Sequence, residues 1–475
     1  MEIRDRFSGP IEGALAAGGD PATSPLYVFG PFLALIVPAG VAHVTFGPSI
    51  WLVVLTVATV AMMYRQVMQW VVDGTGGTGL SEEEFGPTAA KVNASITLVE
   101  YSLTFLVSMS ALVTFLADRW VGMRMAVAGI DVSVLVAVGL TIATGALVTA
   151  GPRTAAVTFG PATAAVIGLL WLMMGAAVWQ HGLVLPGWDF AAFDREHLQY
   201  TLGGYARILA LMTGIEVFAN LVAAFDGPPR QRSRFAFRSL VLVMGSTAAA
   251  MIVLGPAILA LSDPMDPDVS VFTQTMDALL PAPVAWLGTW IGVAVLLSAC
   301  ATAIQGIAHL SHGLSHRHYL PTTFGRPNHH GISTSTVWSA VIVLSAGFVL
   351  FGTDERTYLA LYAAGVFVLL SMTGWAATKR LVGSDERAGA AERAIQLIAV
   401  VAAASLTSVA TMIVFAERFA EGAWLYLVLV PILFVAMTGC RASRGTPTSS
   451  EETAGRCLAC QCRGLASSTC ACTIG

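Results

Sequence analysis

Continuous apolar runs of about 20 residues recur along the chain, and they constrain its fold more than any other feature. A run of this length can cross the hydrocarbon core of a bilayer as a helix, whereas a membrane β-barrel would alternate apolar and polar positions. The composition agrees, because 56% of the residues are hydrophobic and only 11% are charged. The chain is therefore predicted to be an all-α polytopic membrane protein.

A hydropathy window of about 19 residues predicts about twelve transmembrane helices. Their ranges are 22–44, 49–71, 92–117, 131–150, 159–180, 203–224, 237–261, 283–308, 335–352, 356–378, 394–415 and 422–440. The glycine-rich segment 73–86 between the second and third helices is predicted to be a flexible turn.

Residues 441–475 are predicted to be a disordered, Cys-rich cytoplasmic tail. No histidine and no hydrophobic pattern accompany its cysteines, which are Cys457, Cys460, Cys462, Cys470 and Cys472. Thiolates that converge could bind a soft metal, but without a pattern that would build a small domain we predict no metal and no other cofactor.

The charges of the loops predict the orientation. Basic residues collect in the loops on the N-terminal side of the membrane, as in the 230–238 segment with its four arginines. The loop 262–282 on the other side has four aspartates and neither Lys nor Arg. Because basic loops stay in the cytoplasm, the chain is predicted to lie in the cell membrane with both termini cytoplasmic.

The first span begins with residues that a continuous helix does not favour. Within 18–27 (GGDPATSPLY), Pro21 and Pro25 lack backbone N–H donors and two glycines weaken the helical turn. Asp20 adds an ionisable group, which membranes tolerate only where it faces protein or a water-filled cavity. Two interpretations stay open: a break in the first helix that holds a charged or polar substrate, and a loop that precedes the span.

A polar face runs along the third span. Glu100, Thr104 and Ser108 are spaced by four residues, so they lie on one side of a helix with Tyr101 beside them. Hydroxyl groups alone could serve as hydrogen bonds between membrane helices. A carboxylate fits that role poorly, because its removal from water costs several kcal/mol. We interpret this face as part of a functional site.

The sixth span repeats the interruption of the first. Thr213, Gly214 and Glu216 break an apolar run, and Asn220 follows one turn later. Interrupted helices at matching places in two halves of a membrane chain are typical of inverted-repeat transporters. Spans one to five and six to ten are predicted to be the two repeats, followed by two more helices. Residues 1–440 would then be a twelve-helix transporter domain with its substrate near the midplane.

Several strings of residues resemble the amino acid–polyamine–organocation superfamily, and within it the KimA-type potassium–proton symporters. DPATSPLY at 20–27 is similar to that branch's S-D-x-x-S-S-x-x-Y, and VEYSLTFLVS at 99–108 is similar to D-Y-x-L-T-x-x-V-S. TGIEVFAN at 213–220 is similar to T-G-x-E-x-x-x-N, and LYAAGVF at 361–367 to L-Y-x-x-G-V-F. The likeness covers most of residues 10–380 and implies a LeuT-like fold of five plus five inverted helices with two helices after them.

Carried over position by position, the resemblance implies a set of side chains that line the substrate site. They are Asp20, Tyr27, Tyr101, Thr104, Ser108, Thr213 and Tyr362. Glu100 and Glu216 are expected to take and release a coupling proton. Two positions depart from the family pattern: the third-span Asp of the family is Glu100 here, and its A-N-T in the eighth span is replaced around 300–303 (CATA).

The substrate stays open between two classes. Oxygen donors at these positions suit a potassium ion, whereas the carboxylate of an amino acid would suit the exposed N-termini of broken helices. Proton-coupled potassium uptake by alternating access is the first hypothesis and an amino acid or amine permease is the second. A membrane sensor with a transporter fold is the alternative of another class.

An enzyme is not predicted, since the sequence contains no recognisable nucleophile–base pair, metal triad or nucleotide loop. The expected partners are the small-molecule or cation substrate, protons and the lipid bilayer. A homodimer stays open, and nucleic acid is not expected.

Overall fold

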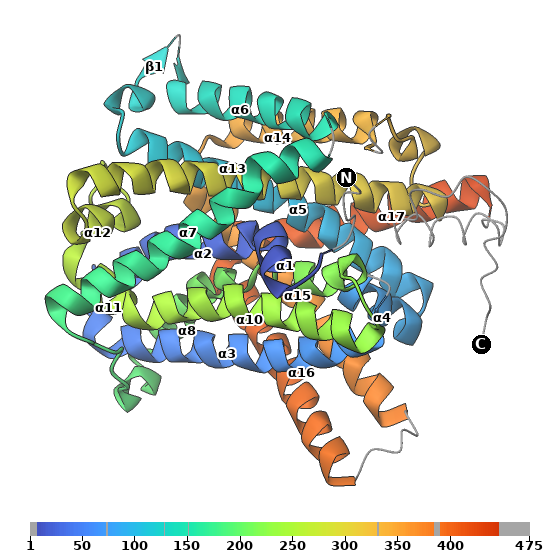
Figure 1. Cartoon of the computed structure of the whole chain (residues 1–475), viewed down its shortest axis with the longest axis horizontal. Coiled ribbons are helices and arrows are strands. Elements are labelled where there is room, and N and C mark those ends of the chain that lie inside the picture. The colour runs from blue at the N-terminus through green and yellow to red at the C-terminus, as the bar shows by residue number, and fades with distance from the viewer. Residues whose placement is uncertain are drawn as a thin grey trace.

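The computed structural model describes residues 7–72, 75–127, 129–150, 152–329, 332–383 and 390–445. Within these residues, helices make up nearly the whole structure and the strands form one antiparallel hairpin. Figure 1 shows most of the helices running along one common direction. The prediction of an all-α polytopic membrane protein is confirmed. The five clustered cysteines of the predicted tail lie outside the described residues.

In chain order the α-helices are α1 (Pro10–Ala17), α2 (Gly19–Ile36), α3 (Ala42–Trp70), α4 (Gly76–Phe85), α5 (Pro87–Ala117), α6 (Val132–Thr149), α7 (Pro152–His181), α8 (Leu198–Ile208), α9 (Ile215–Asn220), α10 (Pro229–Val253), α11 (Gly255–Leu261), α12 (Val271–Leu279), α13 (Ala282–His316), α14 (Thr334–Phe351), α15 (Glu355–Gly383), α16 (Ala390–Arg418) and α17 (Tyr426–Arg444). The 3-10 helices are η1 (Val121–Arg124), η2 (Phe190–Phe193), η3 (Leu209–Met212), η4 (Leu221–Ala224), η5 (Thr322–Gly325) and η6 (Ala423–Leu425), and the strands are β1 (Ala126–Val127) and β2 (Ile130–Asp131).

Eleven helical segments of the described residues are long and apolar enough to cross a membrane. They correspond to the second to twelfth predicted spans, and several extend about two turns beyond the predicted ends. The first predicted span corresponds to α2, which is 18 residues long but begins with Asp20, two prolines and two hydroxyl residues. α2 is not among the eleven segments, and its first turns are polar.

The first span is interrupted at Gly18, between α1 and α2. A Cβ at Gly18 would lie 2.8 Å from Val243, so the missing side chain lets α10 approach. The interpretation of 18–25 as a loop before the span is wrong, because α2 begins at Gly19 and residues 19–25 are helical. The break covers only Gly18, whereas the unusual residues of the sequence extend over 18–27. Pro21 falls in the first turn of α2, where no N–H is needed, and Pro25 lies inside the helix.

The sixth span is interrupted at Thr213 and Gly214. α8 and η3 run up to Met212, and α9 starts at Ile215. Gly214 has a φ of +78°, a left-handed conformation that glycine adopts without steric penalty. The Thr-Gly step of the sequence therefore sets the position of this break, and the prediction that the first and sixth helices are broken is confirmed.

Helices of the two halves pack against each other in matching pairs. α2 contacts α8, α3 contacts α10, α5 contacts α13, and α6 contacts α14. Figure 1 shows the last two pairs in the upper part of the bundle. These are spans 1 and 6, 2 and 7, 3 and 8, and 4 and 9, the partners that a repeat of five plus five helices would bring together. The inverted repeat itself stays a prediction. α16 packs against α15, and α17 against α5.

The interior of the bundle is apolar and so is much of its outer surface. Phe32 in α2, Phe105 in α5 and Phe218 in α9 are fully buried. Ile342 and Val343 on α14 are about two thirds exposed, at 68% and 66%. Exposed apolar side chains on a helix long enough to cross a bilayer are expected to face lipid.

Candidate functional site

Three carboxylates line one cavity at the breaks of the first and sixth spans. The cavity has a volume of about 40 Å³, and its walls come from α2, α4, α5 and α9 with the Gly214 break. About 10–15 Å³ is enough for one water, so the cavity has room for a small ion with a few waters. The residues that line it are Asp20, Thr78, Thr97, Glu100, Tyr101, Thr104, Gly214, Glu216, Val217 and Asn220, none of which is basic.

Asp20 lies where the two broken helices meet. It follows the first break directly and occupies the first turn of α2, where the helix dipole stabilises a carboxylate. Gly214 leaves space for it, because a Cβ there would lie 2.9 Å from Asp20 Oδ2. The other carboxylate oxygen, Oδ1, is buried without a hydrogen-bond partner. A buried polar atom of this kind normally has a partner such as water, an ion or a ligand.

The polar face of the third span lies on α5. Thr104 donates its hydroxyl hydrogen to the Glu100 carbonyl at 3.0 Å, which leaves its oxygen lone pairs available to a cation. Tyr101 places its ring against Gly306 of α13, where a Cβ would lie 2.8 Å from the ring. Glu100, Tyr101 and Thr104 line the cavity. Ser108, one turn further along, does not line it, but its hydroxyl oxygen is buried without a partner.

A second group of hydroxyls lies beside Asp20 and outside the cavity lining. Ser24 Oγ is 3.4 Å from Tyr27 Oη and 3.5 Å from Thr213 Oγ1, so weak hydrogen bonds join the first broken helix to the sixth. Tyr362 of α15 is close enough to interact electrostatically with Asp20 and Tyr27, and its hydroxyl oxygen is buried without a hydrogen-bond partner. The structure therefore brings Tyr27, Thr213 and Tyr362 together around Asp20.

Helix α4 closes the cavity on the side of Glu216. Thr78 of α4 donates a hydrogen bond to Glu216 Oε1 at 3.2 Å. Gly76 lets the helix come close, because a Cβ there would lie 2.1 Å from Asn220 Oδ1 in α9. The far end of α4 carries ion pairs with residues beyond the cavity: Glu82 with Arg317, Glu83 with Arg380 at 2.7 Å, and Glu84 with Arg380 at 3.2 Å.

Three polar side chains of the lining, Thr78, Thr97 and Asn220, were not predicted as site residues from the sequence. Thr97 lies about one turn before Glu100 on the same helix, so the spacing of the polar face could have identified it. Asn220 follows Glu216 by about one helical turn and was not predicted as a site residue. Thr78 belongs to the segment 73–86, whose interpretation as a flexible turn is wrong over residues 76–85, because these form α4.

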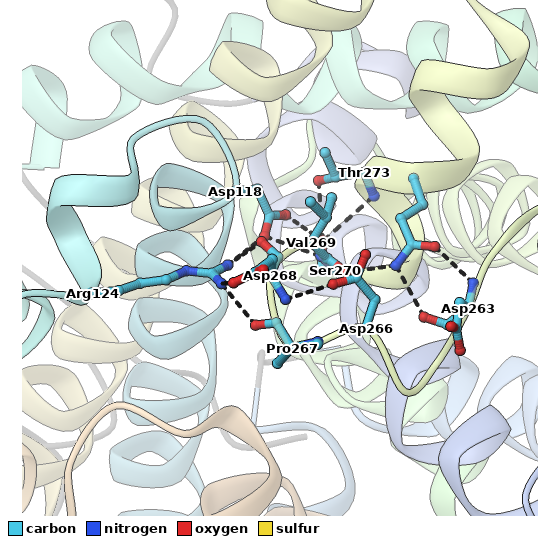
Figure 2. Close-up of polar contacts among 10 residues, drawn as sticks. Asp118, Arg124, Asp263, Asp266, Pro267, Asp268, Val269, Ser270 and Thr273 are labelled. Carbon is cyan, nitrogen blue, oxygen red and sulfur yellow. Dashed lines mark hydrogen bonds and ion pairs between the residues drawn. The ribbon is translucent and has the colours of Figure 1, made fainter.

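At the end of the bundle where α2 and α5 finish, the connection from α11 to α12 is tied to the end of α5 (Figure 2). Ser270 donates its backbone N–H and its hydroxyl to the two Asp118 carboxylate oxygens, at 3.0 and 2.5 Å. Arg124 pairs with Asp268 and donates to the Pro267 carbonyl at 2.8 Å. The Asp118 side chain has no exposed surface, and this burial raises its pKa. Because α12 also packs against α2, the network holds the far end of the first span in place.

A similar chain among curated proteins is the potassium transporter KimA of Bacillus subtilis (strain 168). The two sequences are 26% identical over 367 residues, which cover 73% of this chain and 58% of KimA. The predicted resemblance is confirmed. This chain thus spans 58% of the length of KimA. No protein-family model matches the sequence. With its apolar helices and KimA as a relative, the chain is a multi-pass membrane protein related to a transporter.

A solved structure with a related outline is the crystal structure of the Eremococcus coleocola manganese transporter in complex with an aromatic bis-isothiourea substituted compound. The two chains are 12% identical, with a TM-score of 0.43 over 94% of this chain and 95% of the other. A score of this size describes a weak likeness of overall shape.

Proposed function

We propose that the protein is a secondary active transporter of a small monovalent cation, and that it takes up potassium together with protons by alternating access. The convergence of Asp20, Glu100 and Glu216 on a cavity lined by no basic residue supports this most directly. Like charges in a site removed from bulk water repel each other strongly. A bound cation and bound protons reduce that repulsion, and the name of KimA supports potassium as the cation.

The proposed cation ligands are the predicted site residues, namely Asp20, Tyr27, Tyr101, Thr104, Ser108, Thr213 and Tyr362. All of them offer oxygen atoms, which hard cations prefer as ligands. The buried oxygens of Asp20, Ser108 and Tyr362 that have no hydrogen-bond partner support the assignment. A cation, or water bound to it, would satisfy them. Asp20, Tyr101 and Thr104 would hold the ion at the cavity, and the others would extend the route beyond Asp20.

Glu100 and Glu216 are the proposed proton carriers. One potassium ion neutralises one carboxylate, so two negative charges would remain in the closed site if Glu100 and Glu216 stayed ionised. Buried charges without partners cost several kcal/mol each. Protonation of both glutamates makes the loaded site neutral, and this gives a physical reason for the ion and the protons to cross together.

The size of the cavity argues against an amino acid or amine as substrate. Pockets for organic ligands commonly enclose about 300–1,000 Å³, whereas this cavity encloses about 40 Å³. The cavity would have to widen greatly to admit an amino acid, while an ion with a few waters fits without rearrangement. A sensor with a transporter fold would bind the ion and move none.

The test is ion flux in liposomes that contain the purified protein and a potassium-sensitive dye. An imposed proton gradient should drive potassium in, and Asp20→Asn should abolish the flux while the protein stays folded. Asp131→Asn makes the same charge change at an exposed position outside the spans and should transport normally. Normal transport by Asp20→Asn would refute the proposed site. Absence of potassium flux in the wild type would refute the proposal of potassium transport. Uptake of a labelled amino acid in the same liposomes would show that the substrate is an amino acid instead.

A further inference from the structure

A basic groove lies between α3 and α10, away from the carboxylate cavity. It has a volume of about 590 Å³ and is open along one side. Figure 1 shows the two helices side by side in the lower part of the bundle, and they pack against each other. The groove is lined by Arg65, Arg234, Phe237, Arg238, Val241 and Leu242. Arg65 lies near the end of α3, and the arginines of α10 lie near its start.

The three arginines of the groove have no negative partner in the described parts of the chain. Their side chains are exposed, and none of them forms a hydrogen bond or an ion pair there. The guanidinium of Arg65 lies 5.8 Å from the centre of the Phe237 ring, a cation–π contact that orients it without neutralising it. Arginines gathered in one groove repel each other unless an anion joins them, and the planar guanidinium matches a phosphate in two-point contacts.

The other end of the groove is apolar. Val241 and Leu242 are 48% and 43% exposed, and they follow Arg238 by about one helical turn. The groove therefore passes from positive charge to hydrocarbon over a few ångströms, as the boundary between lipid headgroups and acyl chains does. The same stretch of the chain is predicted to face the cytoplasm because of its arginines, and the cytoplasmic leaflet is rich in anionic lipid.

We propose that this groove binds an anionic phospholipid of the cytoplasmic leaflet. The phosphate would contact Arg65, Arg234 and Arg238, and an acyl chain would lie over Val241 and Leu242. A free phosphate would use only the basic end. Because the apolar end continues directly from it, the geometry favours the lipid over the free anion.

The test is native mass spectrometry of the full chain released from phosphatidylcholine nanodiscs that contain a small share of phosphatidylglycerol. The wild type should retain phosphatidylglycerol selectively, and the double variant Arg65→Gln/Arg238→Gln should retain roughly 30-fold less, at about 1 kcal/mol for each arginine. Arg65→Lys/Arg238→Lys keeps both charges and should retain most of the lipid. The matched control is Arg195→Gln/Arg326→Gln, which removes two exposed arginines elsewhere and should retain as much lipid as the wild type.

Two results would overturn the assignment. One is equal retention by the wild type and the Arg65→Gln/Arg238→Gln variant. The other is displacement of the lipid by millimolar inorganic phosphate, which would show a site for the free anion. Lipid retention does not depend on ion flux, so failure of this proposal and failure of the transport proposal can be told apart. A thermal melt of each variant shows whether it is folded. If Arg65→Gln/Arg238→Gln does not fold, the test compares Arg65→Lys/Arg238→Lys, which should retain the lipid, with Arg234→Gln, which should retain less.

Discussion

Replacing Gly214 by alanine should impair transport far more than it impairs folding. The φ of +78° at Gly214 costs an alanine roughly 1–2 kcal/mol. The new Cβ would also lie 2.6 Å from Pro21 Cγ and 2.9 Å from Asp20 Oδ2. An ordinary contact begins at 3.4 Å, so the Pro21 ring must move from 2.6 to 3.4 Å, by about 0.8 Å, and Asp20 must move with it.

Gly352 provides a matched control for the backbone cost. Its φ is +77°, and no atom lies within 4 Å of the Cβ that Gly352→Ala would add. Displacement by about 1 Å at a reactive site can lower a rate on the order of 100-fold. We therefore expect Gly214→Ala to lose roughly tenfold or more of the potassium flux in liposomes, and Gly352→Ala to keep it.

Both variants place an alanine at a similar positive φ, but only Gly214→Ala must also displace Pro21, so it should lose more thermal stability in detergent than Gly352→Ala while both stay folded. Wild-type flux in Gly214→Ala would show that the close approach of the two broken helices does not position Asp20. A loss of flux in Gly352→Ala as large as that in Gly214→Ala would show that backbone strain alone explains the effect.

Two further predictions concern other contacts. Gly306→Ala adds a Cβ 2.8 Å from the Tyr101 ring and should lower the flux severalfold by displacing the ring, whereas Gly313→Ala on the same helix meets open space and should leave it unchanged; equal flux in both would contradict the placement of Tyr101. Burial raises the pKa of Asp118, so the folded state holds this proton more tightly than the unfolded state. The stability it contributes is present below the ordinary carboxyl range and is lost as the pH rises toward the raised pKa, so Asp118→Asn should flatten the fall in melting temperature as the pH rises above about 4. An unchanged slope in that variant would mean that another group titrates.

The spans and both breaks could be predicted because their signals are local. An apolar run long enough to cross a bilayer, and a glycine that allows positive φ at 214, have the same meaning in any neighbourhood. The α1 helix was harder to predict from the sequence, since Pro10–Ala17 is only eight residues long and belongs to no apolar run of membrane length. Its place in the first span depends on Gly18 and the approach of α10, which are tertiary contacts.

The sequence predicted the residue types of the candidate site, but it did not predict which of those residues line the cavity and which lie outside it. Helical spacing placed Glu100 and Thr104 together, and both line the cavity. Nothing in the spacing indicates that Ser108 lies beyond the lining, because that depends on where α9 and α4 end against α5. The contribution of Thr78 also depends on tertiary packing, because it requires the glycine-rich helix α4 to approach its neighbours closely. Residue spacing along the chain could therefore not predict it.

The contacts that hold α4 over the cavity affect how often the site can open, as well as how well it is closed. At Gly76 the backbone of α4 meets the side chain of Asn220, so closing there fixes the Asn220 rotamer but adds no rotamer of its own from residue 76. The ion pairs at the other end of α4 are partly exposed, and such pairs contribute about 0–1 kcal/mol each. Leu80 of α4 is fully buried, so moving this helix away from the site would expose apolar surface and would cost free energy. In the proposed transport cycle α4 would therefore spend most of its time closed over the site, and opening on this side would be the rarer event.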